Sequence, residues 1–303
     1  MTRGVVLHGT GGVWHVQCED GESVEAALRG RVKHAGKIKL AVGDQVTLDS
    51  DAGGSGWTIV EVLPRRSKLS RREPGRAHGE RIIAANVDQV LVVFALRQPE
   101  PHVAMLDRFL VIAEANSLAG VVVVNKVDLA GEAEARRLFA AYEAIGYPLH
   151  ITSCRTGNGL VELREQLRGR TTVVTGPSGV GKSSLMNALY PGLQLRVGEI
   201  SASVNKGRHT TVGAYLHPLP DGGFVVDTPG LREIGLWGVP SRGLDACFPE
   251  IRALRDQCRF GDCSHLAEPD CAVRGALASG RVDASRYASY QKLLDEALQT
   301  EKY

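Results

Sequence analysis

The 303-residue sequence contains no uninterrupted apolar run near the roughly 20 residues that a membrane-spanning helix needs. Residues 1–8 also contain no apolar core of the length found in signal peptides. Formal net charge is only +2, so any basic surface must be local rather than spread over the molecule. These absences predict a cytoplasmic protein with no membrane partner.

Cysteine is also scarce, with six residues in the chain, and half of them are widely scattered, at Cys18, Cys154 and Cys247. The other three, Cys258, Cys263 and Cys271, fall within 14 residues together with His265. Such a pattern in a cytosolic chain argues against a disulfide framework and for one metal site. Three thiolates and one imidazole suit tetrahedral Zn²⁺, and four protein ligands predict a structural zinc. The alternative is three buried cysteines and a surface histidine.

Residues 176–184 read GPSGVGKSS and fit the phosphate-binding pattern G-x-x-x-x-G-K-S. An apolar run before them predicts a buried strand and the segment after them predicts a helix, an arrangement in which backbone N–H groups bind phosphates. We expect Lys182 to contact the β- and γ-phosphates and Ser183 to bind Mg²⁺. A simple glycine-rich turn is the alternative. The nucleotide-binding residues predicted here are Gly176, Pro177, Ser178, Gly179, Val180, Gly181, Lys182, Ser183 and Ser184.

Two further motifs follow predicted strands. In NKVD, residues 125–128, the Asp128 carboxylate can accept hydrogen bonds from the guanine N1–H and exocyclic amine. Adenine lacks these donors and would leave the carboxylate unpaired, which is costly. SCRTG, residues 153–157, looks like the S-A-K loop of GTPases, with cysteine where alanine is usual. We therefore predict a guanine site formed by Asn125, Lys126, Val127, Asp128, Ser153 and Cys154.

The segment after the phosphate loop is expected to contain two switches. Residues 199–212 are polar and basic, and Thr211, or alternatively Thr210, would bind Mg²⁺ and the γ-phosphate. In DTPG, the later motif, Asp227 would hold a Mg²⁺-bound water and the Gly230 N–H would contact the γ-phosphate. Both motifs therefore predict the magnesium side of a GTP site.

One position departs from Ras-like GTPases, which orient the attacking water with a glutamine just after this second motif. The residue here is Leu231, which can neither donate nor accept a hydrogen bond. Slow intrinsic hydrolysis is therefore expected, with the missing group supplied by a partner or another residue. His209 is the candidate, and a histidine that only contacts RNA or solvent is the alternative.

The order of these motifs is unusual, because both base-recognition loops precede the phosphate loop. Conventional GTPases have them after it, so the order indicates a circular permutation. Residues 81–235 alternate strand-like and helix-like segments, which predicts a doubly wound α/β sheet. Strands are expected at 87–95, 120–124, 148–152, 171–175, 213–217 and 223–226. Helices are expected at 105–118, 132–146, 160–167 and 184–190.

The remaining segments predict a multidomain protein. Residues 1–66 suit a small closed barrel such as an OB-fold, with strands at 4–8, 13–18, 37–40, 45–48 and 57–62. The basic run within them could bind RNA or simply face solvent. Residues 67–80 are expected to form a basic linker. Residues 236–303 are expected to form a zinc-binding helical domain with helices around 241–256 and 283–298.

Together, the barrel, the motif order NKVD–SCRTG–GPSGVGKSS–GRHTT–DTPG and the Cys₃His loop resemble the RsgA family of circularly permuted, ribosome small-subunit-dependent GTPases. The resemblance covers the whole chain and departs from the family pattern at Cys154 and Val212. It implies an OB-fold N-terminal domain, hydrolysis of GTP to GDP and phosphate stimulated by the 30S subunit, and a role late in maturation of that subunit. We also expect a monomer that binds GTP and GDP and contacts 16S rRNA. An RNA-binding assembly protein using GTP only as a conformational ligand is the alternative, and a GTPase that delivers metal is a third.

Overall fold

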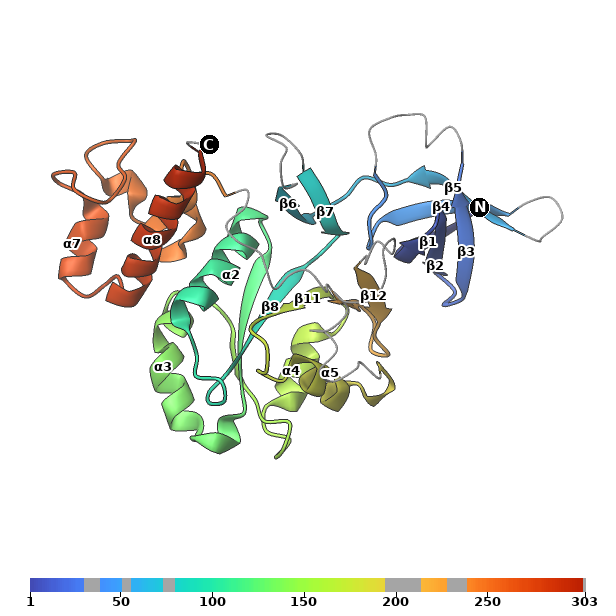
Figure 1. The fold of residues 1–303 in the computed structure, drawn as a ribbon, viewed down its shortest axis with the longest axis horizontal. Helices are drawn as coiled ribbons and strands as arrows, with labels where there is room; N and C mark the ends of the chain where they lie inside the picture. Colours follow the sequence, from blue (N-terminus) through green and yellow to red (C-terminus); the bar gives the residue numbers. More distant parts are fainter. Residues whose placement is uncertain (30–38, 51–55, 73–79, 194–213, 228–238, 302–303) are drawn as a thin grey trace.

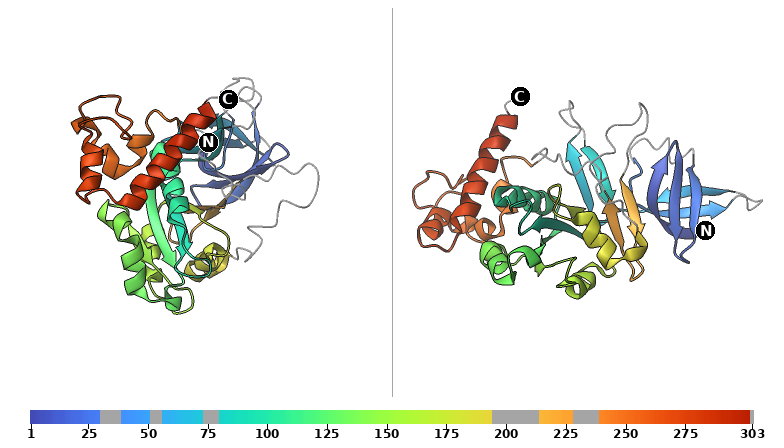
Figure 2. Two further views of the ribbon diagram at one scale, coloured as in Figure 1. Left: turned by 60° about the vertical axis from the view of Figure 1, so that its left-hand side comes forward. Right: turned by 60° about the horizontal axis from the view of Figure 1, so that its bottom comes forward.

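The computed structural model describes residues 1–29, 39–50, 56–72, 80–193, 214–227 and 239–301. An N-terminal barrel and a C-terminal helical module lie on opposite sides of a central α/β sheet (Figures 1 and 2). This is the multidomain architecture that the sequence predicts. Among the described helices, none combines the length and the hydrophobicity needed to cross a membrane.

The barrel is closed by five strands in the order β1-β2-β3-β5-β4. They are β1 (Thr2–Thr10), β2 (Val13–Cys18), β3 (Ser23–Leu28), β4 (Gln45–Ser50) and β5 (Trp57–Val62). Its interior is filled by apolar side chains that alternate along the strands, including Val6, Val16, Val46, Leu48 and Ile59. The predicted OB-like barrel is confirmed.

The third strand differs from the prediction. A strand was expected at 37–40, but residues 37 and 38 lie outside the described part, and Lys39 and Leu40 belong to no strand. Instead β3, with the sequence SVEAAL, pairs with β2 and runs parallel to β5. Only Ala26 of β3 is fully buried, and alanine and glutamate are poor strand formers. The segment therefore carries little strand signal, and tertiary pairing determines its structure.

A two-stranded antiparallel hairpin, β6 (Lys68–Arg72) with β7 (Glu80–Ala85), follows the barrel. The expected linker at 67–80 therefore contains a strand rather than being irregular throughout. Leu69 and Ala84 are completely buried in a hydrophobic cluster that extends into the central sheet. A single leucine among basic residues is too weak a pattern to predict this strand from sequence.

The central sheet has the strand order β10-β9-β8-β11-β13-β12, in which only β12 is antiparallel to its neighbour. Its strands are β8 (Gln89–Ala95), β9 (Ala119–Asn125), β10 (Leu149–Ile151), β11 (Thr171–Thr175), β12 (Tyr215–Pro218) and β13 (Phe224–Asp227). Every residue of β8 is buried, as expected for a parallel strand covered on both faces. The sheet order and the position of β8 at its centre agree with the predicted α/β fold.

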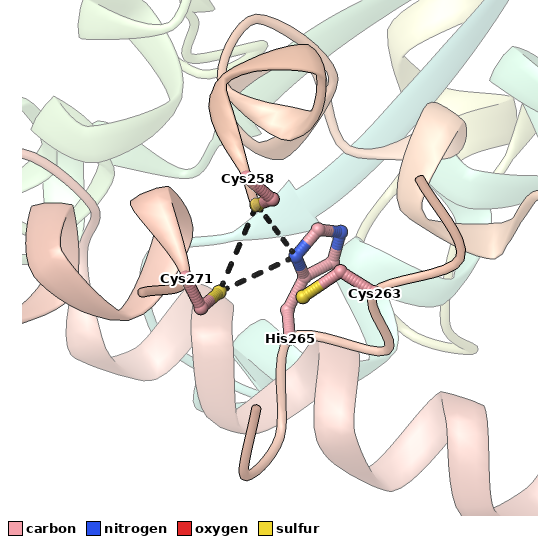
Figure 3. Close-up of side chains that lie close together, drawn as sticks. All are labelled: Cys258, Cys263, His265 and Cys271. Carbon is pink, nitrogen blue, oxygen red and sulfur yellow. Dashed lines mark hydrogen bonds between the residues drawn. The ribbon is translucent and has the colours of Figure 1, made fainter. Parts of the chain in front are cut away.

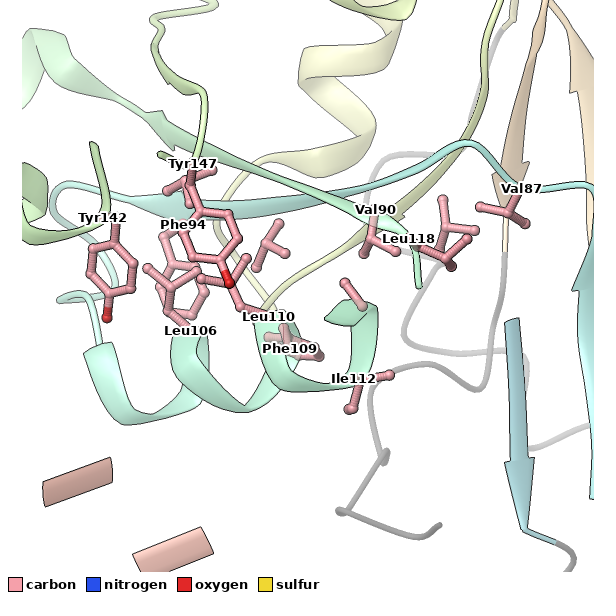
Figure 4. Close-up of a cluster of buried hydrophobic side chains, with 14 of the residues drawn as sticks. Val87, Val90, Phe94, Leu106, Phe109, Leu110, Ile112, Leu118, Tyr142 and Tyr147 are labelled. Atoms are coloured by element: carbon pink, nitrogen blue, oxygen red, sulfur yellow. The ribbon is translucent and has the colours of Figure 1, made fainter. Parts of the chain in front are cut away.

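Helices cover both faces of this sheet, so the predicted doubly wound fold is confirmed. One face packs on α2 (Val103–Ala115) and α3 (Glu132–Ala144), and the other packs on α4 (Leu160–Leu167) and α5 (Lys182–Leu189). Figure 4 shows Leu106 and Leu110 of α2 directed toward Phe94 of β8. The helical repeat of apolar residues in α2 predicted this buried face.

The C-terminal module consists of η6 (Leu244–Cys247), α6 (Pro249–Arg252), η7 (Arg255–Gln257), α7 (Ala272–Ala278) and α8 (Ala284–Glu301). The helical stretch expected around 241–256 is divided into three short helical segments. Phe248 has extended backbone angles and Pro249 begins α6, so the chain starts a new helix there. The expected terminal helix is α8, which packs against α2.

Candidate functional site

The predicted motifs meet at one edge of the central sheet. Asn125 and Asp227 are the last residues of β9 and β13, while Gly176 directly follows β11. Ser153 lies just beyond the end of β10. In an open α/β sheet the carboxyl ends of the strands form the ligand-binding edge. Residues far apart in sequence therefore converge on one candidate nucleotide site.

Glycine is required at two positions of the phosphate loop. Gly176 has a φ of +134°, and an added Cβ atom would lie 2.0 Å from the Val93 carbonyl oxygen. Gly181 has a φ of +93°, and its Cβ would lie 2.7 Å from Asn125 Nδ2. The first glycine lets the loop pass close to the backbone of β8, and the second lets it approach the NKVD loop.

Lys182 begins α5 and is buried within the phosphate loop. Its ammonium group donates hydrogen bonds to the carbonyl oxygens of Gly176 at 2.7 Å and Pro177 at 2.6 Å. Ser183, the predicted magnesium ligand, follows it at the buried N-terminal turn of the same helix. A lysine cation and a helix N-terminus thus lie together, which is an arrangement that binds phosphate.

The NKVD loop is bonded directly to the phosphate loop. Asn125 donates a hydrogen bond from Nδ2 to the Val180 carbonyl oxygen at 2.9 Å. Lys126 donates from Nζ to the Gly179 carbonyl oxygen at 2.6 Å and to the Gln98 carbonyl oxygen. These contacts fix the distance between the base-recognition and phosphate-binding loops.

Asp128 is held by the SCRTG loop. Ser153 donates a hydrogen bond from Oγ to Asp128 Oδ1 at 2.6 Å, and Arg155 Nη1 lies 3.9 Å from Oδ2. The Asp128 side chain is 13% exposed, so it is mostly shielded from water yet reachable. The carboxylate is thereby oriented at the ligand-binding edge of the sheet.

Cys154 replaces the usual alanine without disturbing this arrangement. Its thiol lies 3.7 Å from Asn125 Oδ1, at a half-buried position beside the base-recognition loop. Burial raises the pKa of the Cys154 thiol, so the neutral form predominates. A small, uncharged side chain therefore occupies the alanine position.

The switch residues are only partly described. Asp227 lies at the end of β13, beside the phosphate-loop strand β11 in the sheet. The other predicted switch residues lie outside the described residues, namely His209, Thr210, Thr211, Gly230 and Leu231.

The four predicted metal ligands come together in the C-terminal module (Figure 3). Their ligand atoms all lie within 4.8 Å of one another. His265 Nδ1 is 3.6 Å from Cys258 Sγ and 3.5 Å from Cys271 Sγ, and the two sulfurs are 3.9 Å apart. Around a tetrahedral Zn²⁺ with Zn–S bonds of about 2.3 Å, two sulfurs lie about 3.8 Å apart. The cluster could therefore hold a metal ion, with His265 coordinating through Nδ1.

The thiols of this donor set would ionise on binding a metal ion. Burial and the neighbouring Cys271 and Cys258 thiols raise the pKa of Cys263 to about 12. A metal ion binds thiolates, so it would offset the cost of ionising these buried groups. The four side chains form a donor set that could hold a metal ion.

Residues outside the motif hold the metal loop in place. Tyr287 and Tyr290 of α8 donate hydrogen bonds to the backbone carbonyls of His265 at 2.5 Å and Ser264 at 2.9 Å. The Glu268 carboxylate accepts hydrogen bonds from Ser264 Oγ at 2.5 Å and from the backbone N–H groups of residues 264, 266 and 267. Sequence reasoning missed these supports, although the i, i+3 spacing of the tyrosines signals one helix face.

A mostly parallel sheet with the phosphate-loop motif and the NKVD and SCRTG motifs at one edge is the arrangement of a P-loop GTPase, here with circularly permuted motifs. The family model for RsgA GTPase matches residues 62–237. Together with the full-length relatives below, this match shows that the chain belongs to the RsgA GTPase family. It is a GTP hydrolase of that family.

Relatives match nearly the full chain. The small ribosomal subunit biogenesis GTPase RsgA of Gemmatimonas aurantiaca is 58% identical over 98% of both chains. The protein of the same name from Moorella thermoacetica is 41% identical over 99% of both. The crystal structure of YjeQ from Thermotoga maritima is 36% identical, covers 98% of both chains and has a TM-score of 0.82. The circularly permuted GTPase YloQ is 28% identical, with a TM-score of 0.80, over 99% of this chain and 96% of YloQ.

Proposed function

We propose that this GTPase binds the 30S ribosomal subunit through 16S rRNA and hydrolyses GTP to GDP and phosphate late in maturation of that subunit. The observation that carries the proposal is the Asn125–Val180 hydrogen bond of 2.9 Å, which joins the base-recognition loop to the phosphate loop. One nucleotide could therefore contact both loops at once. The relatives' names, small ribosomal subunit biogenesis GTPase, supply the partner.

On binding, GTP would replace some of the hydrogen bonds that the site residues make with one another. Phosphate oxygens would replace the Gly176 and Pro177 carbonyls as acceptors for Lys182, while backbone N–H groups of residues 176–184 bind the remaining oxygens. Asp128 would accept the two guanine donors while Ser153 keeps the carboxylate oriented. Mg²⁺ bound with GTP would neutralise phosphate charge.

On the magnesium side, Ser183 and Thr211 would be the ligands, with Thr210 as the alternative threonine. Asp227, at the end of β13, would hold a magnesium-bound water. The Gly230 N–H would contact the γ-phosphate. These roles follow from the motif pattern, and alanine variants at Ser183 and Thr211 should raise the magnesium concentration that hydrolysis requires.

The water-orienting group is the open step, because Leu231 cannot hydrogen-bond to water. We propose His209 for this role. His209→Ala should reduce ribosome-stimulated turnover by about 100-fold, as expected when a group that positions the nucleophile is lost, while GTP affinity is retained. Unchanged stimulated turnover in this variant would assign His209 to RNA or solvent contact instead.

The decisive experiment measures GTP turnover with added 30S, 50S and 70S particles. Stimulation confined to particles containing an accessible 30S surface supports the proposal. GTP-dependent 30S binding without any stimulation would favour an RNA-binding protein that uses GTP only as a conformational ligand. Stimulation by 50S alone would contradict both readings.

We propose zinc as the metal of the Cys₃His cluster, in a structural role. Four protein ligands leave no position for substrate or water on a tetrahedral ion. Zinc bound there would be held by Cys258, Cys263, His265 and Cys271. Zinc that exchanged readily with a weak chelator would favour a metal-delivery function instead.

We also propose domain boundaries at 1–66, 67–80, 81–235 and 236–303, in a cytoplasmic monomer. The buried Leu69 of β6 attaches the second segment to the hydrophobic cluster of the GTPase sheet. Limited proteolysis should therefore spare residues 68–72, and light scattering should give the mass of one chain. Rapid cleavage there would support a free linker.

A further inference from the structure

An aromatic contact joins the barrel to the edge of the GTPase sheet. The His8 ring of β1 lies 4.8 Å from the Tyr215 ring of β12, measured between centroids. His8 also stacks on His15 of β2, with the ring centroids 4.0 Å apart and an interplanar angle of 14°. Strand β12 is the edge strand nearest the barrel (Figure 1). Three rings from two parts of the fold thus lie in contact, and we call them the ring joint.

Apolar packing also joins the barrel to the sheet beside this contact. Leu7, next to His8 in β1, is buried in the same hydrophobic cluster as Leu216 of β12 and Val226 of β13. Asn86, between β7 and β8, donates a hydrogen bond from Nδ2 to the Gly43 carbonyl oxygen at 2.9 Å. This bond joins the barrel to the segment that precedes the central sheet. Because packed interiors transmit displacement rather than absorb it, movement of β1 would be passed to β12.

Strand β12 leads from the ring joint to the magnesium side of the nucleotide site. Tyr215 is the antiparallel partner of Asp227, and Leu216 is the partner of Val226. Tyr215 also lies only a few residues after the predicted first switch at 199–212. The same residue therefore contacts the barrel through its ring and the Asp227 strand through its backbone.

We infer that His8 and Tyr215 position Asp227, and that the position of Asp227 changes when a partner binds the barrel. This inference rests on the proposed function, which gives Asp227 its magnesium role and the 30S subunit its stimulating role. A partner that binds the barrel would shift β1, and the ring joint would carry that shift through β12 to the Asp227 carboxylate. His8 and Tyr215 act through another residue, so they are positioning residues.

The test compares GTP turnover of the full-length protein with and without 30S subunits in His8→Ala, Tyr215→Ala and the double variant. Stimulated turnover should fall about fivefold or more, the range of typical coupling between sites, while basal turnover and GTP affinity stay close to wild type. The double variant should lose no more stimulation than the more strongly impaired single variant, because both substitutions remove one shared contact.

Two controls separate the ring contact from general damage. Tyr215→Phe keeps the ring and should retain wild-type stimulation. His150→Ala removes a histidine from β10, at the opposite edge of the sheet, and should leave both activities unchanged.

The outcomes distinguish failure of the ring-joint inference from failure of the proposed function. A wild-type protein that 30S does not stimulate overturns the proposed function and the joint with it. Normal stimulation of His8→Ala and Tyr215→Ala, beside a stimulated wild type, overturns the joint alone. The joint is also overturned if basal and stimulated turnover fall by the same factor, if the two losses add, or if Tyr215→Phe behaves like Tyr215→Ala.

Discussion

Arg286 of α8 donates a hydrogen bond from Nη1 to Asp107 Oδ1 of α2 at 2.7 Å, across 179 positions of sequence. Both side chains are buried, with 1% and 0% of their surface exposed. The guanidinium also donates from Nε to Glu250 Oε1 at 2.7 Å and lies 4.7 Å from the centroid of the Phe248 ring. This arginine therefore attaches the C-terminal module to the GTPase sheet.

Replacing Arg286 with methionine should detach or loosen α8. Asp107 and Glu250 would remain buried without their cation, and breaking such a pair costs about 3–5 kcal/mol. The free energy of opening of α8, measured from the exchange of its backbone amides, should fall by that amount. The matched control is Arg252→Met, which removes an exposed pair between the same module and Glu114 of α2. That pair should contribute less than about 1 kcal/mol, and equal losses would contradict the assignment.

The convergence of the predicted nucleotide-site motifs on one sheet edge could be predicted from sequence, because each motif needs particular residues at fixed spacing after a strand. The glycines at 176 and 181 have positive φ and no room for a Cβ atom, so the chemistry constrains the sequence directly. The metal cluster was predictable for the same reason, since all four ligands fall within 14 residues. Local constraint of this kind is visible without a structure.

Contacts between distant elements could not be predicted in this way. Nothing near Asp107 or Arg286 in sequence indicates that they pair, because the contact depends on how α8 packs on α2. The third barrel strand was missed because Ala26 is its only fully buried residue. The helical stretch expected around 241–256 is divided, because Phe248 has extended backbone angles and Pro249 starts a new helix within it. Tertiary packing decides all three features.

Asp128→Asn should change the base preference of the site. Guanine would lose its carboxylate acceptor, so GTP affinity should fall by about 100-fold or more, as for other sites built around a substrate donor. The asparagine amide could donate to the 2-oxo group of xanthine, so binding of xanthosine triphosphate should increase. Competition binding with both nucleotides measures the switch. Ser153→Ala, which only removes the hydrogen bond orienting Asp128, should weaken GTP binding without favouring xanthosine triphosphate; equal behaviour of the two variants would contradict base recognition by Asp128.

Metal analysis should find one zinc per chain, and Cys271→Ser should lose it. Without the ion the buried thiols have no cation, so the loop carrying residues 258–271 should exchange its amides rapidly, as should the part of α8 carrying Tyr287 and Tyr290. Cys247→Ser is the control, because Cys247 is a buried cysteine of the same module outside the cluster. It should keep one zinc. Retention of zinc by both variants would exclude Cys271 as a required ligand.

The ring joint should also be sensitive to acid. Burial, followed by the nearby His15 and His217, lowers the pKa of His8 from its ordinary value of 6.5. The unfolded chain therefore binds more protons than the folded chain just below pH 6.5, so the joint loses stability as pH falls through 6.5 toward the lower folded pKa. The titratable groups around it come from four strands, namely His15, Glu25, Tyr215, His217 and Asp227.

An NMR titration of the imidazole protons should give His8 a midpoint below 6.5. His15→Gln removes a neighbouring ring that can become cationic, so the His8 midpoint should move upward. Tyr215→Ala should also raise it, because the His8 ring becomes more exposed to water and its charged form is less penalised. His150→Gln, in β10 at the far edge of the sheet, should leave the His8 midpoint where it was. If the His8 midpoint is the same as in wild type in both His15→Gln and Tyr215→Ala, His8 does not contact these rings in solution.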